Sequence, residues 1–487
     1  MIDVPPGRIR RLNRREIRTD ARYVLYWMTA SRRPFWNFGL QRAARWARQQ
    51  ARPLVVLEAL RCDYPWASDR LHAFVLQGMR QNQAHFDRTP ALYYPYVESS
   101  SGAGKGLLKA LAQQASVVVT DDFPAFFLPR MLETAAQQVS VLLEAVDSNG
   151  LLPMRSAPQV FSTAYAFRRF LQRELPAHLL EQPLEDPLAT LEPSPPITLP
   201  SALYEKWPAA DLKALDGGPG SLRSLPLNHQ VSPVSTLGGW QRAEEVWQAF
   251  LARSLSVYAL DRSHPDERAT SGLSPYLHFG HLSAHQVFSQ LAEAEEWTLD
   301  HIGRTATGKR TGWWGMSEGA EAFLDQLITW REIGFNLCGF RNDYDRYESL
   351  PQWARDELDR HASDRRPALY TLEHFETSET HDSLWNAAQR QLVEEGIMHN
   401  YLRMLWGKKI LEWTSSPQEA LAIMIELNNK YALDGRDPNS YSGIFWILGR
   451  YDRPWGPDRP VFGKIRYMSS ASALRKLRVT EYLARFG

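Results

Sequence analysis

Residues 23–60 read YVLYWMTASRRPFWNFGLQRAARWARQQARPLVVLEAL. The stretch begins and ends with runs of β-branched and aromatic residues, at 23–29 and 54–60, and an amphipathic segment at 36–50 separates them. Strand, helix and strand in this order favour a crossover that pairs the two strands in parallel. We therefore expect the fold to begin with a parallel α/β unit.

The same alternation continues to about residue 150. Two further strands are predicted at 117–120 and 139–146, and amphipathic helices at 70–85, 107–115 and 126–137. The pattern predicts a Rossmann-like, doubly wound parallel sheet over residues 1–150. No GxGxxG motif follows the first strand, and the glycine cluster at 102–106 lacks Walker A spacing, so we interpret that cluster as a flexible loop.

The pattern changes twice after this domain. Six prolines lie between Pro183 and Pro200, and a glycine-rich patch follows at 217–220, so residues 151–235 are predicted to be a helix and a long connector. From Gly239 onward the periodicity is helical, for example at 240–256, 320–337 and 383–413. We expect an all-α domain over residues 236–487.

Composition excludes several classes of protein. The chain of 487 residues is 44% hydrophobic and 23% charged, and it has no run of about 18 apolar residues, so a membrane protein is not expected. Cys62 and Cys338 lack the paired spacing of a disulfide or metal framework, and no metal site is predicted. Seven arginines in the first 22 residues are followed by no apolar stretch, so no secretory signal is expected.

Charge is distributed unevenly. The formal net charge is only +1, but the segment from Tyr441 to the end holds nine Lys or Arg against three Asp or Glu. Such an excess attracts phosphate backbones. An ordinary solvated basic tail explains the same count.

Tryptophan is concentrated in the helical half, which holds twelve of the seventeen. Trp406 and Trp413 are seven residues apart on one predicted helix and share a face, and Trp385 lies on the stretch before it. A row of indoles can pass an electron by hopping. Spacing alone does not distinguish such a chain from a packed core.

The segment TSGLSPYLHFGHLS, at 270–283, places hydroxyl groups and a glycine where a helix is predicted to begin. Backbone N–H groups and hydroxyls there can hold a phosphate, and an ordinary capped turn accounts for the composition equally well.

This segment resembles the FAD pyrophosphate-binding stretch of the photolyase and cryptochrome family. Four later strings are similar to those of its class II members, the cyclobutane pyrimidine dimer (CPD) photolyases: THDSLWNAAQ from Thr380, MHNYLRMLWGKKILEW from Met398, LDGRDPNSYSGIFW from Leu433 and FGKIRYMS from Phe462. YVLYWM at 23–28 resembles the family's opening strand. The resemblance covers nearly the whole chain and is weakest in the proline-rich connector.

The resemblance implies roles for individual residues. The positions that match FAD-binding residues are Tyr258, Thr270, Ser271, Gly272, Leu273 and Ser274, with Arg403 and Asp434 as a charged pair beside the isoalloxazine and Asn428 facing flavin N5. The tryptophan chain, outward from the flavin, would be Trp406, Trp385 and Trp413. The lesion pocket would be lined by Trp330, Met404 and Trp446, and the opened DNA supported by Arg453 and Arg466.

One position departs from the family's pattern. In FLDQLITWREIGFN, at 323–336, Gln326 stands where the family usually carries a catalytic glutamate, four residues before the lesion-stacking Trp330. An amide can donate a hydrogen bond but can neither ionise nor deliver a proton. The neighbouring Asp325 is rotated by about 100° on a helix, so we do not expect it to substitute.

The resemblance implies a flavoprotein that repairs CPDs in UV-damaged double-stranded DNA by electron transfer from photoexcited reduced FAD. An antenna chromophore, 8-hydroxy-deazaflavin or folate, is expected in the α/β domain. Two alternatives stay open: a cryptochrome-like photoreceptor, which Gln326 favours although no output extension follows Gly487, and a non-catalytic flavoprotein that binds damaged DNA. A cytoplasmic location is expected, at the nucleoid in a bacterium or in the nucleus of a eukaryote, with no obligate protein partner.

Overall fold

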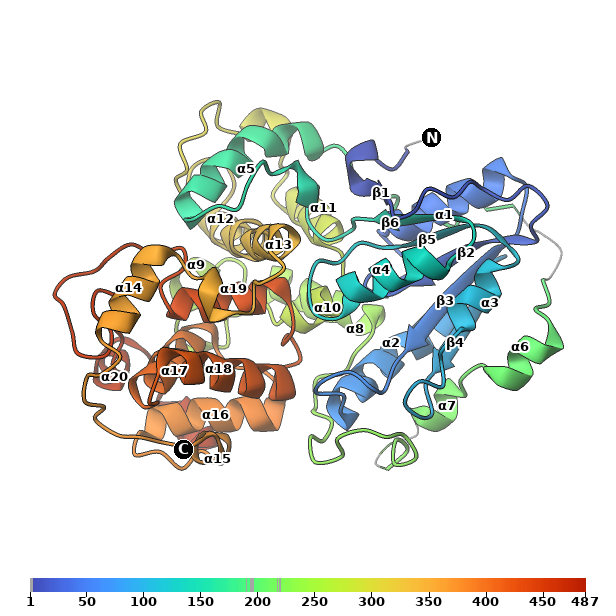
Figure 1. The fold of residues 1–487 in the computed structure, drawn as a ribbon. Helices are drawn as coiled ribbons and strands as arrows, with labels where there is room; N and C mark the ends of the chain where they lie inside the picture. Colours follow the sequence, from blue (N-terminus) through green and yellow to red (C-terminus); the bar gives the residue numbers. More distant parts are fainter. Residues whose placement is uncertain (1–2, 190, 193–196, 217, 219) are drawn as a thin grey trace. The chain divides into compact units, whose positions relative to one another are not determined.

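The computed structural model describes residues 3–189, 191–192, 197–216, 218 and 220–487. Contacts divide the chain into two compact units, and neither is continuous in sequence (Figure 1). The first comprises Met1–Ser156, Leu175–Trp247 and Leu273–Glu293, and the second comprises Ala157–Glu174, Gln248–Gly272 and Ala294–Gly487. The chain therefore passes between the units several times.

The first unit is built on a six-stranded sheet of order β1-β6-β5-β2-β3-β4 (Figure 1). The strands are β1 (Ile9–Arg11), β2 (Tyr23–Met28), β3 (Leu54–Leu60), β4 (Leu92–Val97), β5 (Ala115–Asp121) and β6 (Leu142–Val146). All neighbouring pairs are parallel except β1 with β6. The predicted parallel α/β fold is confirmed.

Helices cover both faces of this sheet, because alternate residues of each buried strand face opposite sides. Val24 and Tyr26 of β2 belong to the core beneath α1 (Phe38–Gln49) and α2 (Asp69–Phe86). Leu25 and Trp27 belong to the other core, beneath α3 (Leu107–Ala112) and α4 (Leu128–Gln138). The sheet is thus doubly wound, as predicted.

Two strands were not predicted. β4 contains Pro95, which cannot donate a hydrogen bond to a ladder, and the strand is tolerated because it lies at one edge of the sheet. β1 is only three residues long, reads Ile-Arg-Arg and forms the other edge. Charged or proline-containing sequences are typical of edges, where one side of the strand has no partner.

Further helices lie in the first unit and in the segments that enter and leave it. They are α5 (Ala164–His178), α6 (Ser201–Lys206), α7 (Leu212–Leu215), α8 (Trp240–Arg253), α10 (Ser274–His278) and α11 (Ala284–Ala294). The predicted helix and connector at 151–235 thus contains α5 and two helices of six and four residues. Its residues 190, 193–196, 217 and 219 lie outside the described part of the chain.

The second unit is helical. Its elements are α9 (Tyr258–Asp261), α12 (Glu318–Leu324), a π-helical segment (Asp325–Trp330), α13 (Arg331–Phe340), α14 (Gln352–Arg360), α15 (Leu372–Glu376), α16 (Ser383–Glu395), α17 (Asn400–Glu412), α18 (Pro417–Tyr431), α19 (Pro438–Ile447), α20 (Ser470–Lys476) and α21 (Thr480–Phe486). The predicted helix at 383–413 is two helices, because Gly396 adopts φ 69° and ends α16 in the left-handed conformation. Over the described part of the chain, no helix combines the length and apolar character needed to cross a membrane.

Candidate functional site

A pocket of about 230 Å³ lies in the second unit, beside α17 and the end of α19. These two helices pack against each other, which brings distant residues to one place. Three residues predicted to contact the lesion or the DNA line it together: Met404, Trp446 and Arg466. The other lining residues are Arg262, Ser263, Asn400, Tyr401, Lys408, Asp452 and Met468.

Trp330 contacts the pocket residue Trp446. Its ring stacks on that of Trp446, with centroids 4.4 Å apart and planes inclined by 22°. Both side chains are only partly buried, so part of the paired surface faces solvent. The two predicted lesion-stacking residues therefore lie together, in an orientation that aromatic rings favour.

Trp330 and Gln326 belong to the π-helical segment that joins α12 to α13. A π-turn inserts extra backbone into a helix and is frequent at functional sites. Asp325 lies in the same segment but is buried, and its Oδ1 accepts a hydrogen bond from Arg168 Nε at 2.7 Å. Asp325 is therefore engaged in an ion pair with Arg168 of α5, and whether it acts in catalysis stays a prediction.

The three tryptophans predicted to form a chain are almost completely buried and lie together. Trp385 Nε1 donates to the backbone oxygen of Trp406 at 3.0 Å, and the rings of Trp385 and Trp413 are 6.1 Å apart. Trp406 Nε1 donates to Gln389 Oε1 at 2.9 Å, which fixes the indole. Trp385 thus contacts both of the others, and their role as an electron-transfer chain stays a prediction.

Three residues predicted to surround the isoalloxazine come from consecutive parts of the helical unit. Arg403 of α17 donates from NH2 to Asp434 Oδ1 at 3.0 Å, and both side chains are largely buried. Asn428 of α18 is 3% exposed, and its amide nitrogen donates to Ser440 Oγ at 2.7 Å. The bonds of Asn428 use its nitrogen, so its amide oxygen is the group left to accept.

The predicted pyrophosphate-binding stretch lies between α9 and α10. Tyr258 begins α9 and is buried, which raises the pKa of its hydroxyl. Thr270 and Gly272 are exposed, and Gly272 adopts φ 66°. Helix α10 begins at Ser274 with Leu273 as its N-cap and no side-chain capping bond, so the hydroxyls of Thr270, Ser271 and Ser274 do not cap this helix. Leu273 and Ser274 belong to the first unit, and the other predicted cofactor residues belong to the second.

Arg453 and Arg466 both lie close to Trp455, an aromatic residue that was not among the predicted site residues. Their guanidinium carbons lie 5.5 and 5.4 Å from the ring of Trp455, which is 40% exposed. Trp455 Nε1 donates to Asp452 Oδ1 at 2.7 Å. An exposed indole with two arginines close to it is suited to contact a nucleic acid, and an aromatic residue within the basic excess was the signal available in the sequence.

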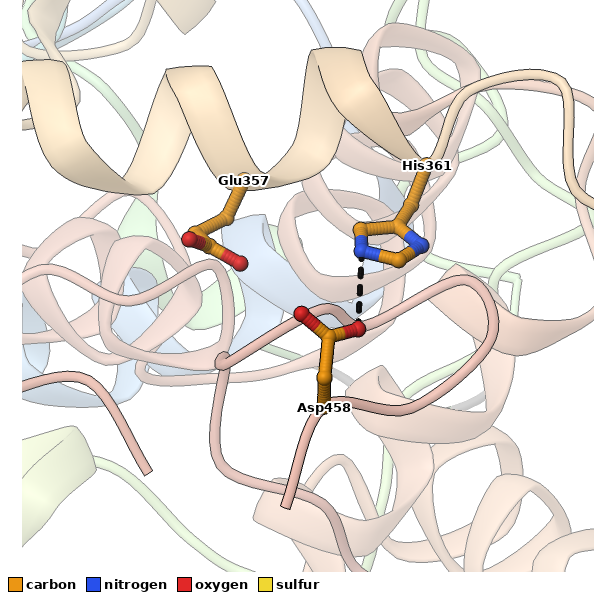
Figure 2. Close-up of side chains that lie close together, drawn as sticks. All are labelled: Glu357, His361 and Asp458. Atoms are coloured by element: carbon orange, nitrogen blue, oxygen red, sulfur yellow. Dashed lines mark ion pairs between the residues drawn. The ribbon is translucent and has the colours of Figure 1, made fainter. Parts of the chain in front are cut away.

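The loop that carries Arg453, Trp455 and Arg466 contacts the C-terminal end of α14. Figure 2 shows Glu357 and His361 directed toward Asp458 of the loop, and His361 Nε2 lies 3.0 Å from Asp458 Oδ1. His361 Nδ1 lies 2.6 Å from Asp364 Oδ2, and this carboxylate also accepts from the backbone N–H of Val461. The ligand atoms of Glu357, His361 and Asp458 lie within 4.8 Å of one another, but Arg360 pairs with both carboxylates of the trio. We interpret the cluster as a group of ion pairs that stabilises the position of the loop against α14.

The chain has relatives of similar length among known proteins. The chain is 32% identical over 480 residues to a deoxyribodipyrimidine photo-lyase of Methanothermobacter thermautotrophicus, with 98% of this chain and 97% of that protein covered. It is 33% identical over 498 residues to a deoxyribodipyrimidine photo-lyase of Arabidopsis thaliana, with 99% and 93% covered. A scan against models of protein families found no match.

Among solved structures, the crystal structure of a bacterial class III photolyase from Agrobacterium tumefaciens has the same fold. The TM-score is 0.66 at 15% sequence identity, and the alignment covers 96% of this chain and 86% of the other. At this identity the likeness concerns the fold alone. Together with the near-full-length relatives, it shows that the chain belongs to the photolyase family.

Proposed function

We propose that the protein repairs cyclobutane pyrimidine dimers in UV-damaged DNA in a light-dependent reaction. The observation that carries the proposal is the pocket lined by Met404 and Trp446, with Trp330 stacked on Trp446 and Arg466 at the same pocket. A dimer flipped out of a duplex loses its stacking and needs flat apolar surfaces to replace it. The stacked indoles offer such a surface.

The exposed basic residues would hold the DNA around the flipped dimer. Arg453 and Arg466 are both exposed beside Trp455, where they could contact phosphates or fill the gap in the opened strand. The ion pair of His361 with Asp458 and the hydrogen bond from Val461 to Asp364 stabilise the loop that carries them. The protein thereby supports the distorted duplex while the pocket receives the lesion.

The residues present fit FAD. Within the second unit, the hydroxyls of Thr270 and Ser271, which cap no helix, suit a pyrophosphate, and Arg403 with Asp434 provides a charged pair for the isoalloxazine. The amide oxygen of Asn428 can accept a hydrogen bond from an N–H group of the cofactor. When bound, reduced FAD excited by light supplies the electron that splits the dimer.

The protein side chains would position and tune the reaction. The buried row of Trp406, Trp385 and Trp413 would carry electrons that bring the cofactor to its active state. Gln326 would donate a hydrogen bond from its amide to the pyrimidine, in place of the family's usual carboxyl group. An antenna chromophore in the α/β unit remains part of the proposal.

A photoreceptor of the cryptochrome type is the second candidate, and Gln326 is the observation that favours it. Losing one electrostatic contact that acts at a transition state costs about 3–4 kcal/mol. A chain with that loss could keep its light-driven electron transfer and have no repair. The intact pocket wall of Trp330 and Trp446 favours repair over this alternative.

The test is repair of a thymine dimer in a short duplex by the reduced protein, in light and in darkness. We expect dimers to disappear only in light. Trp446→Ala should weaken binding of the dimer-containing duplex by about 1–3 kcal/mol, the usual worth of one stacked base, and Trp446→Phe should retain most of the affinity. If the wild type, Trp446→Ala and Trp446→Phe bind the dimer-containing duplex equally well, Trp446 does not stack on the lesion and the pocket is not its binding site.

A further inference from the structure

Lys408 is a lysine in an unusual place. It lies on α17 four residues after Met404, so the two side chains share one face of the helix, and both line the pocket. Lys408 is 1% exposed. Lysine is almost never buried to this degree without a charged partner.

The partner that Lys408 has is not a carboxylate. Its Nζ donates to the backbone oxygen of Ile447 at 2.5 Å, next to Trp446 at the end of α19. Among the described residues no carboxylate forms an ion pair with it, whereas the adjacent Lys409 is paired with Glu412 at 2.6 Å. An ammonium group has three N–H donors, and the bond to Ile447 uses one of them.

The charged groups around Lys408 do not balance its burial. Burial lowers the pKa of Lys408 to about 7, the attraction of Asp452 raises it, and the repulsion of Arg466 lowers it. Both of these residues line the pocket, as do Arg262 and the hydroxyl-bearing Tyr401. The pocket therefore holds an ammonium group whose charge is incompletely compensated, and a ligand that accepts hydrogen bonds would compensate it.

Pyrimidine dimers carry such acceptors in their carbonyl oxygens. We propose that the Lys408 ammonium donates a hydrogen bond to a carbonyl oxygen of the bound dimer and thereby makes recognition of the lesion depend on pH. This inference rests on the proposed function. It gives the pocket a cationic donor although Gln326 cannot ionise.

The sign of the pH dependence follows from the lysine. Below its pKa of about 7 Lys408 is protonated and donates, and above it the neutral amine is a weaker donor. Affinity for the lesion should therefore fall as pH rises through about 7. Undamaged DNA places no base in the pocket, so its affinity should lack this step.

The test is dark binding of two duplexes, identical except for one thymine dimer, measured by fluorescence anisotropy between about pH 6 and about pH 8.5. For the wild-type protein we expect affinity for the dimer-containing duplex to fall about tenfold over this range, equivalent to about 1.4 kcal/mol. Lys408→Met should bind that duplex about tenfold more weakly at the lower pH and show no step. Lys408→Arg should bind it well at every pH, because the guanidinium does not titrate.

Two further results complete the design. Lys476→Met, which removes an exposed positive charge from α20, should weaken binding of both duplexes alike and keep the step. Lys408→Arg retains a donor for Ile447 and carries the test if Lys408→Met does not fold. A step that persists in Lys408→Arg would overturn the inference. Equal binding of the two duplexes by the wild-type protein at every pH would instead overturn the proposed function.

Discussion

Gly334 of α13 packs closely against the backbone at the start of α19. A Cβ atom placed on Gly334 would lie 2.6 Å from the backbone oxygen of Pro438 and 2.7 Å from the nitrogen of Asn439. These are backbone atoms at the start of α19 and cannot rotate away. Gly334→Ala should therefore push α13 and α19 apart, and with them Trp330 and Trp446.

The expected magnitude follows from the distances. Ordinary van der Waals contact begins at 3.4 Å, so the helices must separate by about 0.8 Å at this point. Overpacking of this kind costs about 1–3 kcal/mol, and the better helix propensity of alanine returns about 1 kcal/mol. A gap of that size also forfeits a quarter to a half of the dispersion energy between surfaces that it separates. We expect a net loss of about 1–2 kcal/mol in the free energy of unfolding.

Urea denaturation of the whole protein, followed by tryptophan fluorescence, measures this loss. Gly443→Ala is the matched control, because Gly443 lies on α19 and a Cβ there meets nothing within 4 Å. That variant should gain up to about 1 kcal/mol. Equal stability changes in the two variants would refute the reasoning that the close approach at Gly334 sets the spacing of the tryptophan pair.

Three further predictions follow from other parts of the structure. Trp385→Phe should stop light-driven flavin reduction without loss of bound FAD, since it interrupts the contact with Trp406; transient absorption measures this, and unchanged reduction would contradict the chain. Arg453→Gln should reduce the salt dependence of DNA binding by about one unit of slope, if it neutralises one phosphate; an unchanged slope would place Arg453 away from the backbone. His281 is buried, which lowers its pKa to about 3, and accepts from the N–H of Gly239. The unfolded chain binds its proton below about pH 6.5, so acidification from about pH 7 to about pH 5 should cost about 2 kcal/mol of stability through this residue. His281→Asn should show a smaller loss in urea titrations at the two pH values.

The sequence predicted the buried parts of the α/β unit well. Strand β2 and the first four residues of β3, before Glu58, are runs of apolar and aromatic residues, and such runs are typical of strands covered on both faces. It missed β4, because Pro95 argues against a strand unless the strand is known to lie at an edge. Edge position is a property of the whole sheet, and local patterns do not contain it.

The candidate site also contains residues that the sequence predicted and residues that only the tertiary structure reveals. Met404, Trp446 and Arg466 come from segments that only the family resemblance connected. The packing of α17 with α19 brings Met404 and Trp446 together at the pocket, which Arg466 also lines. Lys408 was missed because four residues after Met404 it looks like an ordinary helix lysine, and only its burial distinguishes it. The π-helical segment at Gln326 was also missed, since its periodicity differs little from that of an α-helix over six residues.

Repair of a defined thymine dimer under light, measured for the reduced protein and for its Gln326→Glu variant, decides whether the protein is a repair enzyme. We expect repair by the wild-type protein, since Trp330 stacks on Trp446 and Met404 and Arg466 line the same pocket, and faster repair by the variant. Absence of repair by both proteins, with FAD bound and reducible by light, would contradict the account and favour a photoreceptor.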